Sequence, residues 1–483
     1  MGYGMSRLDM DVDMNDAPGF ATSSRRGHSE AFDLDNEIFH LTRLRSEPSS
    51  GFKKAINAGQ NAEISTARML WAREANASGR GRFSSADCSC VLGQYLPVNG
   101  PWPVDRMDSR VYVSQFSVDG SLFVAAFQGS RIKIYNVDDG WNVQKDIRAR
   151  SLRWTITDTS LSPDNQYLVY ASMMPIVHIV KMGTAATESH ANITEVHEGL
   201  DFSMHEDVED SFGIFSVKFS SDGRELLAGS NDSSIYVYDL EANKLQSRFP
   251  AHLFDVNTVA FADETGNVVY SGSDDTLCKV WDRRCSVMDR SAAGVLSGHL
   301  EGITFIDSRG DGRYLISNGK DQAIKLWDIR KMSSSTNCDI SRTRTSGWDY
   351  RYSQYPPLYR HLKHPDDQSV ATYRGHSVLR TLIRCYFSPY YSTGQKYIYT
   401  GSHDTSVYIY DVVSGDRVAR LQCHQLTVRD CSWHPYYPLL VSSSWDGQIN
   451  RWEYLGNDVV HATNNGISFR GSIEDQMFRV MYL

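Results

Sequence analysis

The pattern of small, polar and apolar positions repeats along most of the chain. In each strong copy, small residues precede an Asp, and an aromatic residue follows six positions after that Asp. Small residues before a tight turn and β-branched or aromatic residues after it are typical of two antiparallel strands joined at the turn. The five strong copies are AGSNDSSIYVYD, SGSDDTLCKVWD, SNGKDQAIKLWD, TGSHDTSVYIYD and SSSWDGQINRWE, which end at Asp239, Asp282, Asp328, Asp411 and Glu453.

Two weaker copies precede these, and they bring the number of units to seven. They are AAFQGSRIKIYN and YASMMPIVHIVK, in which Gly129 and Met174 replace the Asp. The pattern resembles the WD-repeat family of β-propellers, and Trp281–Asp282 and Trp327–Asp328 are literal copies of its signature dipeptide. Most units are about 42 to 46 residues long, which suits one four-stranded blade each. The resemblance therefore predicts an all-β, seven-bladed WD-repeat β-propeller.

The repeats define the domain organisation. We expect the propeller over residues 106–456, with an insert near 331–373 between the fifth and sixth units. For residues 1–85 we predict a largely disordered N-terminal extension with one short helix near 62–75. Residues 86–105 are expected to form a proline-containing linker. Apolar residues in 457–483 predict a C-terminal tail packed on the propeller. An acidic loop over 201–210 suggests either a basic partner or, as the more common case, a solvated loop.

Histidines recur upstream of the turn aspartates. We expect each His to donate a hydrogen bond to the turn Asp of its own blade, because a buried carboxylate needs a partner. With the aromatic residues of the strand that follows the turn, these side chains form a structural network rather than a catalytic one. Its predicted members are His252, Asp275, Trp281, His299, Asp321, Trp327, His376, Asp404, His424, Asp446 and Trp452.

Composition narrows the possible functions. The chain has 483 residues and a formal net charge of −9, which argues against sequence-independent binding to nucleic acid. Its eight cysteines form no C-x-x-C pair, and Cys88 and Cys90 have poor spacing for zinc, so we expect free thiols in a reducing compartment. No secretory signal and no apolar run long enough for a membrane span is evident.

The motifs of common enzymes are missing from the sequence. It contains neither a GxxxxGK phosphate loop nor a GxSxG nucleophile elbow. A weak metal site could involve His361, His364, Asp366 and Asp367 of the insert, although a solvated polar loop is the simpler interpretation. We therefore predict a protein that is not an enzyme and has no cofactor and no metal site.

A second resemblance concerns the residues that follow the signature dipeptides. Arg284 follows Trp281–Asp282 and Arg330 follows Trp327–Asp328, so two neighbouring units read W-D-x-R. This box is similar to that of substrate receptors of cullin-4 RING ubiquitin ligases. The resemblance implies that Arg284 and Arg330 contact the damaged-DNA-binding adaptor, and that Asp282 and Asp328 orient them.

The predicted N-terminal helix has an apolar face formed by Ile64, Leu70 and Trp71. This face could dock on the adaptor or on the chain's own propeller. The resemblance as a whole implies a nuclear and cytoplasmic receptor that presents a protein substrate for ubiquitination. The alternative is a WD-repeat scaffold of another assembly with no ligase link, and the sequence does not identify the substrate.

Overall fold

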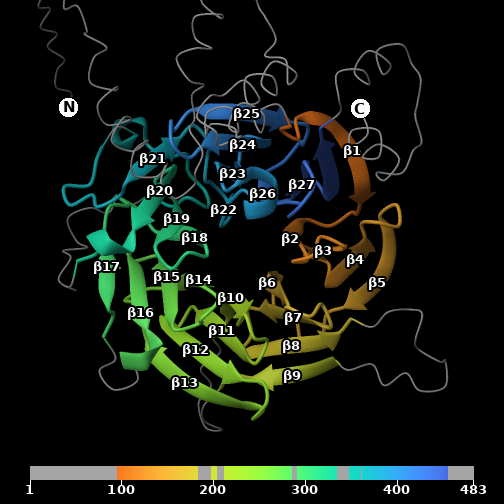
Figure 1. Cartoon of the computed structure of the whole chain (residues 1–483), viewed down its shortest axis with the longest axis horizontal. Coiled ribbons are helices and arrows are strands. Elements are labelled where there is room, and N and C mark those ends of the chain that lie inside the picture. Colours follow the sequence, from red (N-terminus) through yellow and green to blue (C-terminus); the bar gives the residue numbers. More distant parts are fainter. Residues whose placement is uncertain are drawn as a thin grey trace, which may run out of the picture.

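Seven four-stranded antiparallel sheets stand around a common axis in a computed structural model of the chain (Figure 1). The structure describes residues 95–182, 197–203, 212–285, 291–333, 348–360 and 362–454. The predicted seven-bladed, all-β propeller is thereby confirmed. The N-terminal extension with its helix near 62–75, and the tail 457–483, lie outside the described residues and remain predictions.

The first three blades follow the chain in order. The first contains β2 (Val111–Phe116), β3 (Leu122–Phe127), β4 (Arg131–Asn136) and β5 (Asn142–Arg148). The second contains β6 (Ile156–Leu161), β7 (Tyr167–Ser172), β8 (Ile176–Lys181) and β9 (His197–Asp201). The third contains β10 (Ile214–Phe219), β11 (Glu225–Ser230), β12 (Ser234–Asp239) and β13 (Lys244–Pro250).

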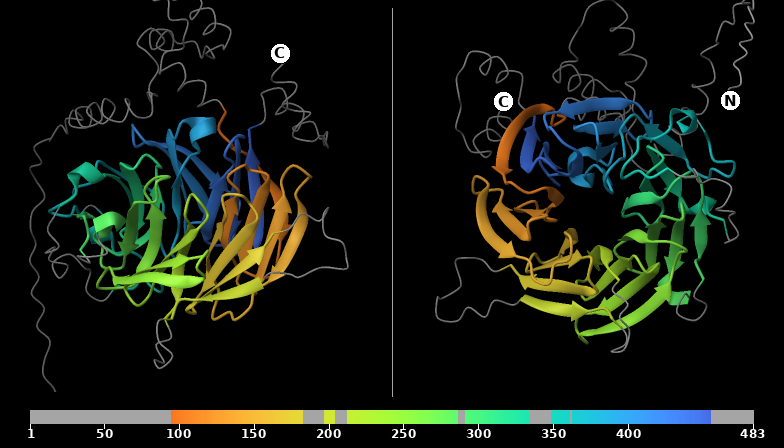
Figure 2. Two further views of the ribbon diagram at one scale, coloured as in Figure 1. Left: turned by 60° about the horizontal axis from the view of Figure 1, so that its bottom comes forward. Right: turned by 180° about the vertical axis from the view of Figure 1, so that it is seen from behind.

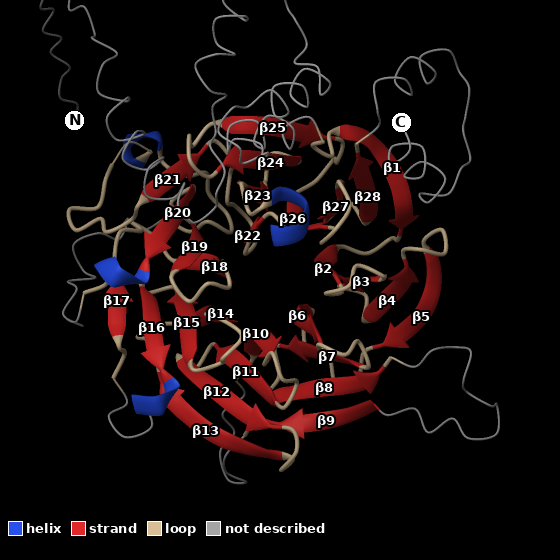
Figure 3. Ribbon diagram, viewed as in Figure 1, coloured by secondary structure: helices blue, strands red, loops and turns tan. Residues whose placement is uncertain are grey.

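The remaining blades continue the same order, with short helical turns in some loops (Figure 3). The fourth contains β14 (Val256–Phe261), β15 (Val268–Ser273), β16 (Cys278–Asp282) and β17 (Gly294–Leu296). The fifth contains β18 (Ile303–Ser308), β19 (Tyr314–Gly319), β20 (Ala323–Asp328) and β21 (Ala371–Arg374), with the 3-10 helices η1 (Ile329–Lys331) and η3 (Pro357–Tyr359) between its last two strands. The sixth contains β22 (Cys385–Phe387), helix α6 (Tyr390–Thr393), β23 (Tyr397–Gly401), β24 (Ser406–Asp411) and β25 (Arg417–Gln422). The seventh contains β26 (Val428–Trp433), β27 (Leu439–Ser444), β28 (Gln448–Glu453) and β1 (Asn99–Arg106).

Strand β1 corrects the expected start of the propeller. It pairs antiparallel with β28, from Asn99 opposite Glu453 to Arg106 opposite Gln448, so the two ends of the propeller chain share one blade. The region 86–105 is therefore not only a linker. Pro101 and Pro103 concealed this strand in the sequence, but an outer strand tolerates proline because one of its edges needs no hydrogen-bond donors.

The insert also lies elsewhere than expected. It separates the third strand of the fifth blade, β20, from the fourth, β21, and does not separate the fifth blade from the sixth. Strand β21 has only four residues and no repeat signature, so the sequence pattern could not place it.

The strands of every blade run between two flat faces of the ring (Figure 2). We call the face with the turns between second and third strands, such as Asp274–Leu277 and Lys320–Gln322, the upper face. The loops that follow the third strands, which begin at Arg283 and Ile329, lie on the opposite, lower face. Apolar side chains fill the space between neighbouring blades, as where Tyr314 and Ile324 pack with Ile398 and Tyr408. No helix of the described residues is both long and apolar enough for a membrane span.

Carboxylates on three first strands bind the backbone of the next blade. Asp158 accepts a hydrogen bond from the Val217 amide (3.0 Å), Asp307 from Phe387 (2.8 Å) and Asp430 from Ser114 (2.9 Å). Asp158 and Asp430 are also close to Arg384, whereas Asp307 forms no ion pair in the described residues. Burial raises the pKa of Asp307 to about 7, so this carboxyl group is partly protonated at neutral pH.

The wild-type protein should lose stability as the pH rises through the pKa of Asp307, and we expect Asp307→Asn to remove this loss. The folded state holds the Asp307 proton more tightly than the unfolded chain, so the stabilisation is complete below about pH 4 and is lost as the pH rises through the folded pKa. The difference in melting temperature between variant and wild type should therefore grow in favour of the variant by about 2 to 3 °C between pH 6 and pH 8. Thermal melts across this range measure it, and a constant difference would contradict the assigned pKa.

Candidate protein-interaction sites

The first W-D-x-R box lies on the lower face, at the end of β16. The Asp282 carboxylate accepts hydrogen bonds from the Arg284 backbone amide (3.0 Å) and from its guanidinium Nε (2.9 Å) and Nη2 (2.7 Å). These hydrogen bonds from Arg284 lower the pKa of Asp282. The turn therefore holds the guanidinium in one orientation without help from another element.

The second box has the same geometry at the end of β20, in the next blade. Asp328 accepts from the Arg330 amide (3.0 Å) and from its Nη2 (3.0 Å), and it also pairs with Arg313 (2.7 Å). Asp328 is buried, yet the side chains of Arg284 and Arg330 remain 66% and 61% exposed. Each arginine thus combines a fixed orientation with a guanidinium edge that is open to a partner.

A third W-D-x-R sequence, Trp348 to Arg351, was missed in the insert. The Asp349 carboxylate accepts from the Arg351 amide (2.9 Å) and from its Nη2 (2.9 Å), as in the other two boxes. However, this box lies on the upper face, where the Arg380 amide donates to the Tyr350 carbonyl (2.9 Å). The clamp is therefore a local property of the sequence D-x-R. What distinguishes Arg284 and Arg330 is their shared face.

Exposed tyrosines on the lower face were also missed. Tyr390 and Tyr391 lie in helix α6, which follows the first strand of the sixth blade, and Tyr436 follows the first strand of the seventh. The rings of Tyr391 and Tyr436 stack with centroids 5.2 Å apart, and all three side chains are exposed. Aromatic and Arg side chains are the usual anchors of protein interfaces. No repeat pattern marks this cluster in the sequence, because these loops differ between blades.

The expected blade network exists in three blades and includes a serine that the sequence pattern did not reveal. His252 contacts Asp275 (2.8 Å) through Nδ1 and Ser271 (2.7 Å) through Nε2, and Trp281 donates to the same Ser271 (2.8 Å). Burial lowers the pKa of His252, against the effect of Asp275. The same four-residue arrangement joins His299, Asp321, Ser317 and Trp327, and His424, Asp446, Ser442 and Trp452.

The sixth blade departs from this network, and the predicted pair of His376 and Asp404 is not formed. His376 instead contacts the Tyr410 hydroxyl (3.2 Å) and Asn318 Oδ1 (3.0 Å). Asp404 accepts from the Tyr408 hydroxyl (2.6 Å). The reason lies in two substitutions, because this blade has Thr400 and Tyr410 where the others have Ser and Trp.

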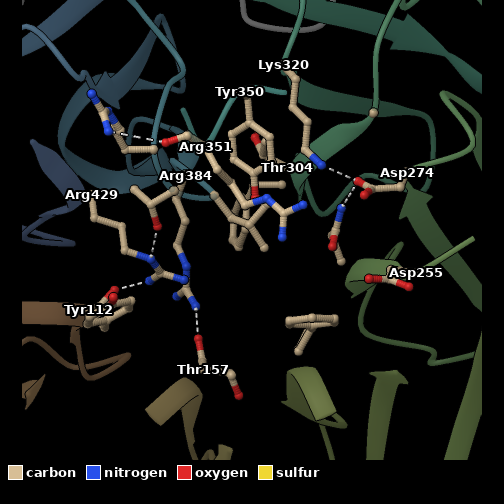
Figure 4. A pocket seen from close by; sticks show the side chains of 18 of the residues that line it. Tyr112, Thr157, Asp255, Asp274, Thr304, Lys320, Tyr350, Arg351, Arg384 and Arg429 are labelled. Atoms are coloured by element: carbon tan, nitrogen blue, oxygen red, sulfur yellow. Dashed lines mark hydrogen bonds and ion pairs between the residues drawn. The ribbon is translucent and has the colours of Figure 1, made fainter. Parts of the chain in front are cut away.

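A cavity of about 510 Å³ opens on the upper face around the propeller axis (Figure 4). Its walls come from several blades and from the insert, which contributes Tyr350 and Arg351. Arg384 and Arg429 lie on one side of the cavity and Asp255 and Asp274 on the other (Figure 4). Two cations therefore face two carboxylates across the cavity, and one of these carboxylates, Asp274, is paired with Lys320 (2.6 Å; Figure 4).

Some predicted residues lie outside the described residues. These are Ile64, Leu70 and Trp71 of the expected helix, and His361. In the insert, the His364 ring accepts from the Asp366 amide (3.0 Å) and Asp367 pairs with Lys325 (2.5 Å). Across the described ranges, no group of three or more His, Cys, Asp or Glu side chains is arranged to hold a metal ion.

Comparison with known proteins agrees with this geometry. The model of the WD domain, G-beta repeat, matches residues 201–239, 243–282, 291–328, 367–411 and 415–453. The chain is 62% identical to the LEC14B protein of Lithospermum erythrorhizon over 96% of its length and 99% of that protein. It is 37% identical to the DDB1- and CUL4-associated factor 11 homolog of Caenorhabditis elegans, over 86% of this chain and 72% of the relative. The DDB1- and CUL4-associated factor 11 homolog of Caenorhabditis briggsae is 36% identical to the chain, over 77% of this chain and 68% of the relative.

Proposed function

Because this chain belongs to the WD-repeat family of the LEC14B proteins and the DDB1- and CUL4-associated factor 11 homologs, we propose that it is a substrate receptor of a cullin-4 RING ubiquitin ligase. In this role it binds the damaged-DNA-binding adaptor through its lower face and presents a protein substrate for ubiquitination. The names of two relatives support this proposal, because they refer to the same adaptor and cullin.

The observation that carries the proposal is the pair of clamped arginines on neighbouring blades. Arg284 and Arg330 emerge from equivalent loops on the lower face, each fixed by an Asp and each exposed. Pre-orientation reduces the side-chain entropy that binding would otherwise cost. The nearby loops of the sixth and seventh blades present Tyr390, Tyr391 and Tyr436 on the same face as further anchors.

In this mechanism the chain itself performs no chemical step. A receptor bound to the ligase on one face and to a substrate on another raises the effective concentration of substrate lysines near the charged conjugating enzyme. We therefore propose a non-catalytic protein that needs no cofactor or metal, works in the nucleus and cytoplasm, and binds neither nucleic acid nor membranes. The free thiols of Cys278, Cys385 and Cys431 suit these reducing compartments.

The test is a titration of the full-length chain with the purified adaptor. We expect the double variant Arg284→Ala/Arg330→Ala to weaken binding by about 30-fold or more, which is about 2 kcal/mol. Its fold should persist, because the pair of Arg284 with Asp282 lies near the surface and the buried Asp328 keeps its ion pair with Arg313 (2.7 Å). Arg351→Ala is the matched control, since it removes the same clamp from the upper face and should leave adaptor binding unchanged.

Two outcomes would contradict the proposal. Absence of adaptor binding by the wild type would favour the second candidate function, a WD-repeat scaffold without a ligase link. Equal binding by the wild type and a folded double variant would show that the boxes do not contact the adaptor.

A further inference from the structure

The cavity on the upper face contains a buried cation, Arg429, that forms no direct ion pair with a carboxylate of the described residues. The Arg429 side chain is part of a residue only 5% exposed, and it donates to the Tyr112 carbonyl and to the Thr381 hydroxyl (3.3 Å). Within the described residues, no carboxylate forms an ion pair with its guanidinium, and its Nη2 has no hydrogen-bond partner. Burial, with nearby Arg384, lowers the pKa of Arg429 to about 10, against the opposite effect of the carboxylates of Asp430 and Asp158. Buried charges are normally paired by direct contact, so this guanidinium has room for an anion bound to its unpartnered edge.

The opposite side of the cavity contains a carboxylate that has no cation as a direct partner. Asp255 is half-buried, and in the described residues its carboxylate accepts no hydrogen bond from another residue and forms no ion pair. Burial and the neighbouring Asp274 raise its pKa. Asp274 is itself neutralised by Lys320 (2.6 Å). Asp255 is thus the carboxylate that remains available to a cation, across the cavity from Arg429 (Figure 4).

Two bulky residues at the edge of the cavity have backbone conformations that L-residues rarely adopt. Trp154 has a φ of 71° and is 59% exposed, and Arg380 also has a φ of 71°. A positive φ is unusual for such side chains and is retained where the surrounding structure requires it. Trp154 packs edge-on against Tyr112 (5.8 Å between centroids), whose carbonyl holds Arg429. Arg380, between the fifth and sixth blades, also lines the cavity; its guanidinium donates to the Arg351 carbonyl (3.4 Å) and forms no ion pair among the described residues.

The insert forms a further part of the cavity wall, next to Arg380. Lys320 lies 4.2 Å from the centroid of the Tyr350 ring, and the Arg380 amide donates to the Tyr350 carbonyl. The insert therefore narrows the cavity on the side of the fifth and sixth blades. On the side of the first and second blades, the exposed Trp154 ring leaves the cavity open to solvent. An open edge with an exposed aromatic residue suits an extended chain better than an enclosed small molecule.

We propose that this cavity binds a short peptide segment that carries both an acidic and a basic side chain. The carboxylate of the segment pairs with Arg429 and Arg380, its basic group pairs with Asp255, and an apolar part packs on Trp154. Peptide binding itself is independent of the ligase, and the further statement that this segment belongs to the ubiquitinated substrate rests on the proposed function. Since the boxes occupy the lower face, substrate and adaptor would bind opposite faces of the ring.

The probe for this proposal is a phage library of random nonapeptides, selected on the immobilised full-length chain. We expect the enriched peptides to carry one acidic and one basic residue within about four positions of each other. Synthetic, fluorescently labelled copies are then titrated by fluorescence polarisation. Asp255→Asn and Arg380→Ala should each weaken binding at least about tenfold, as expected for loss of a charge pair in a recognition site.

Controls separate recognition from folding and from adaptor binding. Arg224→Ala removes an exposed arginine of the third blade on the lower face and should leave peptide binding unchanged. Thermal melts verify that every variant is folded, and a charge reversal provides a positive test: Asp255→Lys should prefer a peptide in which the basic residue is replaced by Glu. Excess free glutamate and lysine should not compete, which distinguishes a peptide from its amino acids as the ligand.

Enrichment of no peptide, enrichment of peptides without the charge pair, or equal binding by wild type and the folded Asp255→Asn and Arg380→Ala variants would each overturn the proposal. Because the adaptor titration uses the other face and a different ligand, failure of one experiment leaves the result of the other intact.

Discussion

Arg384→Ala is expected to lower the free energy of unfolding by about 4 kcal/mol, because it removes the buried cation that two buried carboxylates share. Arg384 precedes β22 in the sixth blade and is buried. Its Nη2 pairs with Asp158 of the second blade (2.8 Å), and its Nη1 lies 3.5 Å from Asp430 of the seventh. Lys218 of the third blade also pairs with Asp158 (3.0 Å). One guanidinium thus joins blades that are far apart around the ring.

The low pKa of Asp158 also indicates that Arg384 stabilises the folded state. Arg384 and Lys218 overcome the effect of burial and lower the pKa of Asp158 to about 2. The stabilisation from this ion pair is therefore present at neutral pH and is lost only as the pH falls from about 4 through the folded pKa. Urea unfolding at pH 7 measures the difference between wild type and Arg384→Ala.

Arg420→Ala is the matched control for this experiment. Arg420 belongs to the same blade and pairs with Asp404 at 3.0 Å, but both side chains are substantially exposed. Such a pair contributes about 1 kcal/mol or less. Equal effects of the two substitutions would show that the buried cluster contributes no more than a surface pair.

Asp321→Ala is the second substitution with a large expected effect, a loss of about 3 kcal/mol in the free energy of unfolding. The buried Asp321 carboxylate accepts from His299 Nδ1 (3.1 Å) and from the Leu300 amide (3.1 Å). Without it, both donors are left unsatisfied in the core, and the His299 ring loses the partner that orients it toward Ser317.

Asp404→Ala provides the comparison, because Asp404 has the same position in the repeat but does not contact its His. Its partners are Tyr408 and Arg420 near the surface, so we expect a loss of about 1 kcal/mol or less. The contrast is measured by urea unfolding of both variants. If Asp404→Ala were as destabilising as Asp321→Ala, the distinction between the fifth and sixth blades would be wrong.

The sequence was sufficient for features that are local and repeated. Each hairpin from second to third strand has its own turn residues and alternation, so the seven blades could be counted even where Gly129 or Met174 replaced the Asp. The partners of the turn Asp could be inferred for the same reason. The serine in this network could have been found too, since Ser271, Ser317 and Ser442 all lie four positions before the Asp.

Features that depend on distant contacts could not be predicted. Strand β1 resembles a linker until β28 is placed beside it, and the insert could be assigned to the fifth blade only through the pairing of β21 with β20. Arg384 and Asp158 are 226 positions apart, and no periodicity connects them. The cavity on the upper face combines residues from loops that share no pattern, because the repeat determines the strands and leaves the loops free to differ.

The pairing of β1 with β28 has a consequence for biosynthesis. Asn99 leaves the ribosome roughly 350 residues before Glu453, its partner in the sheet. At about 5 to 20 residues per second, β1 waits on the order of 20 to 70 s before the strand that receives it has been made. During this time the first blade lacks its contact with the seventh, and the most recently synthesised blade lacks the blade that follows it. The ring therefore cannot close before the seventh blade has been synthesised, and until then the open strand edges are available to chaperones and to aggregation.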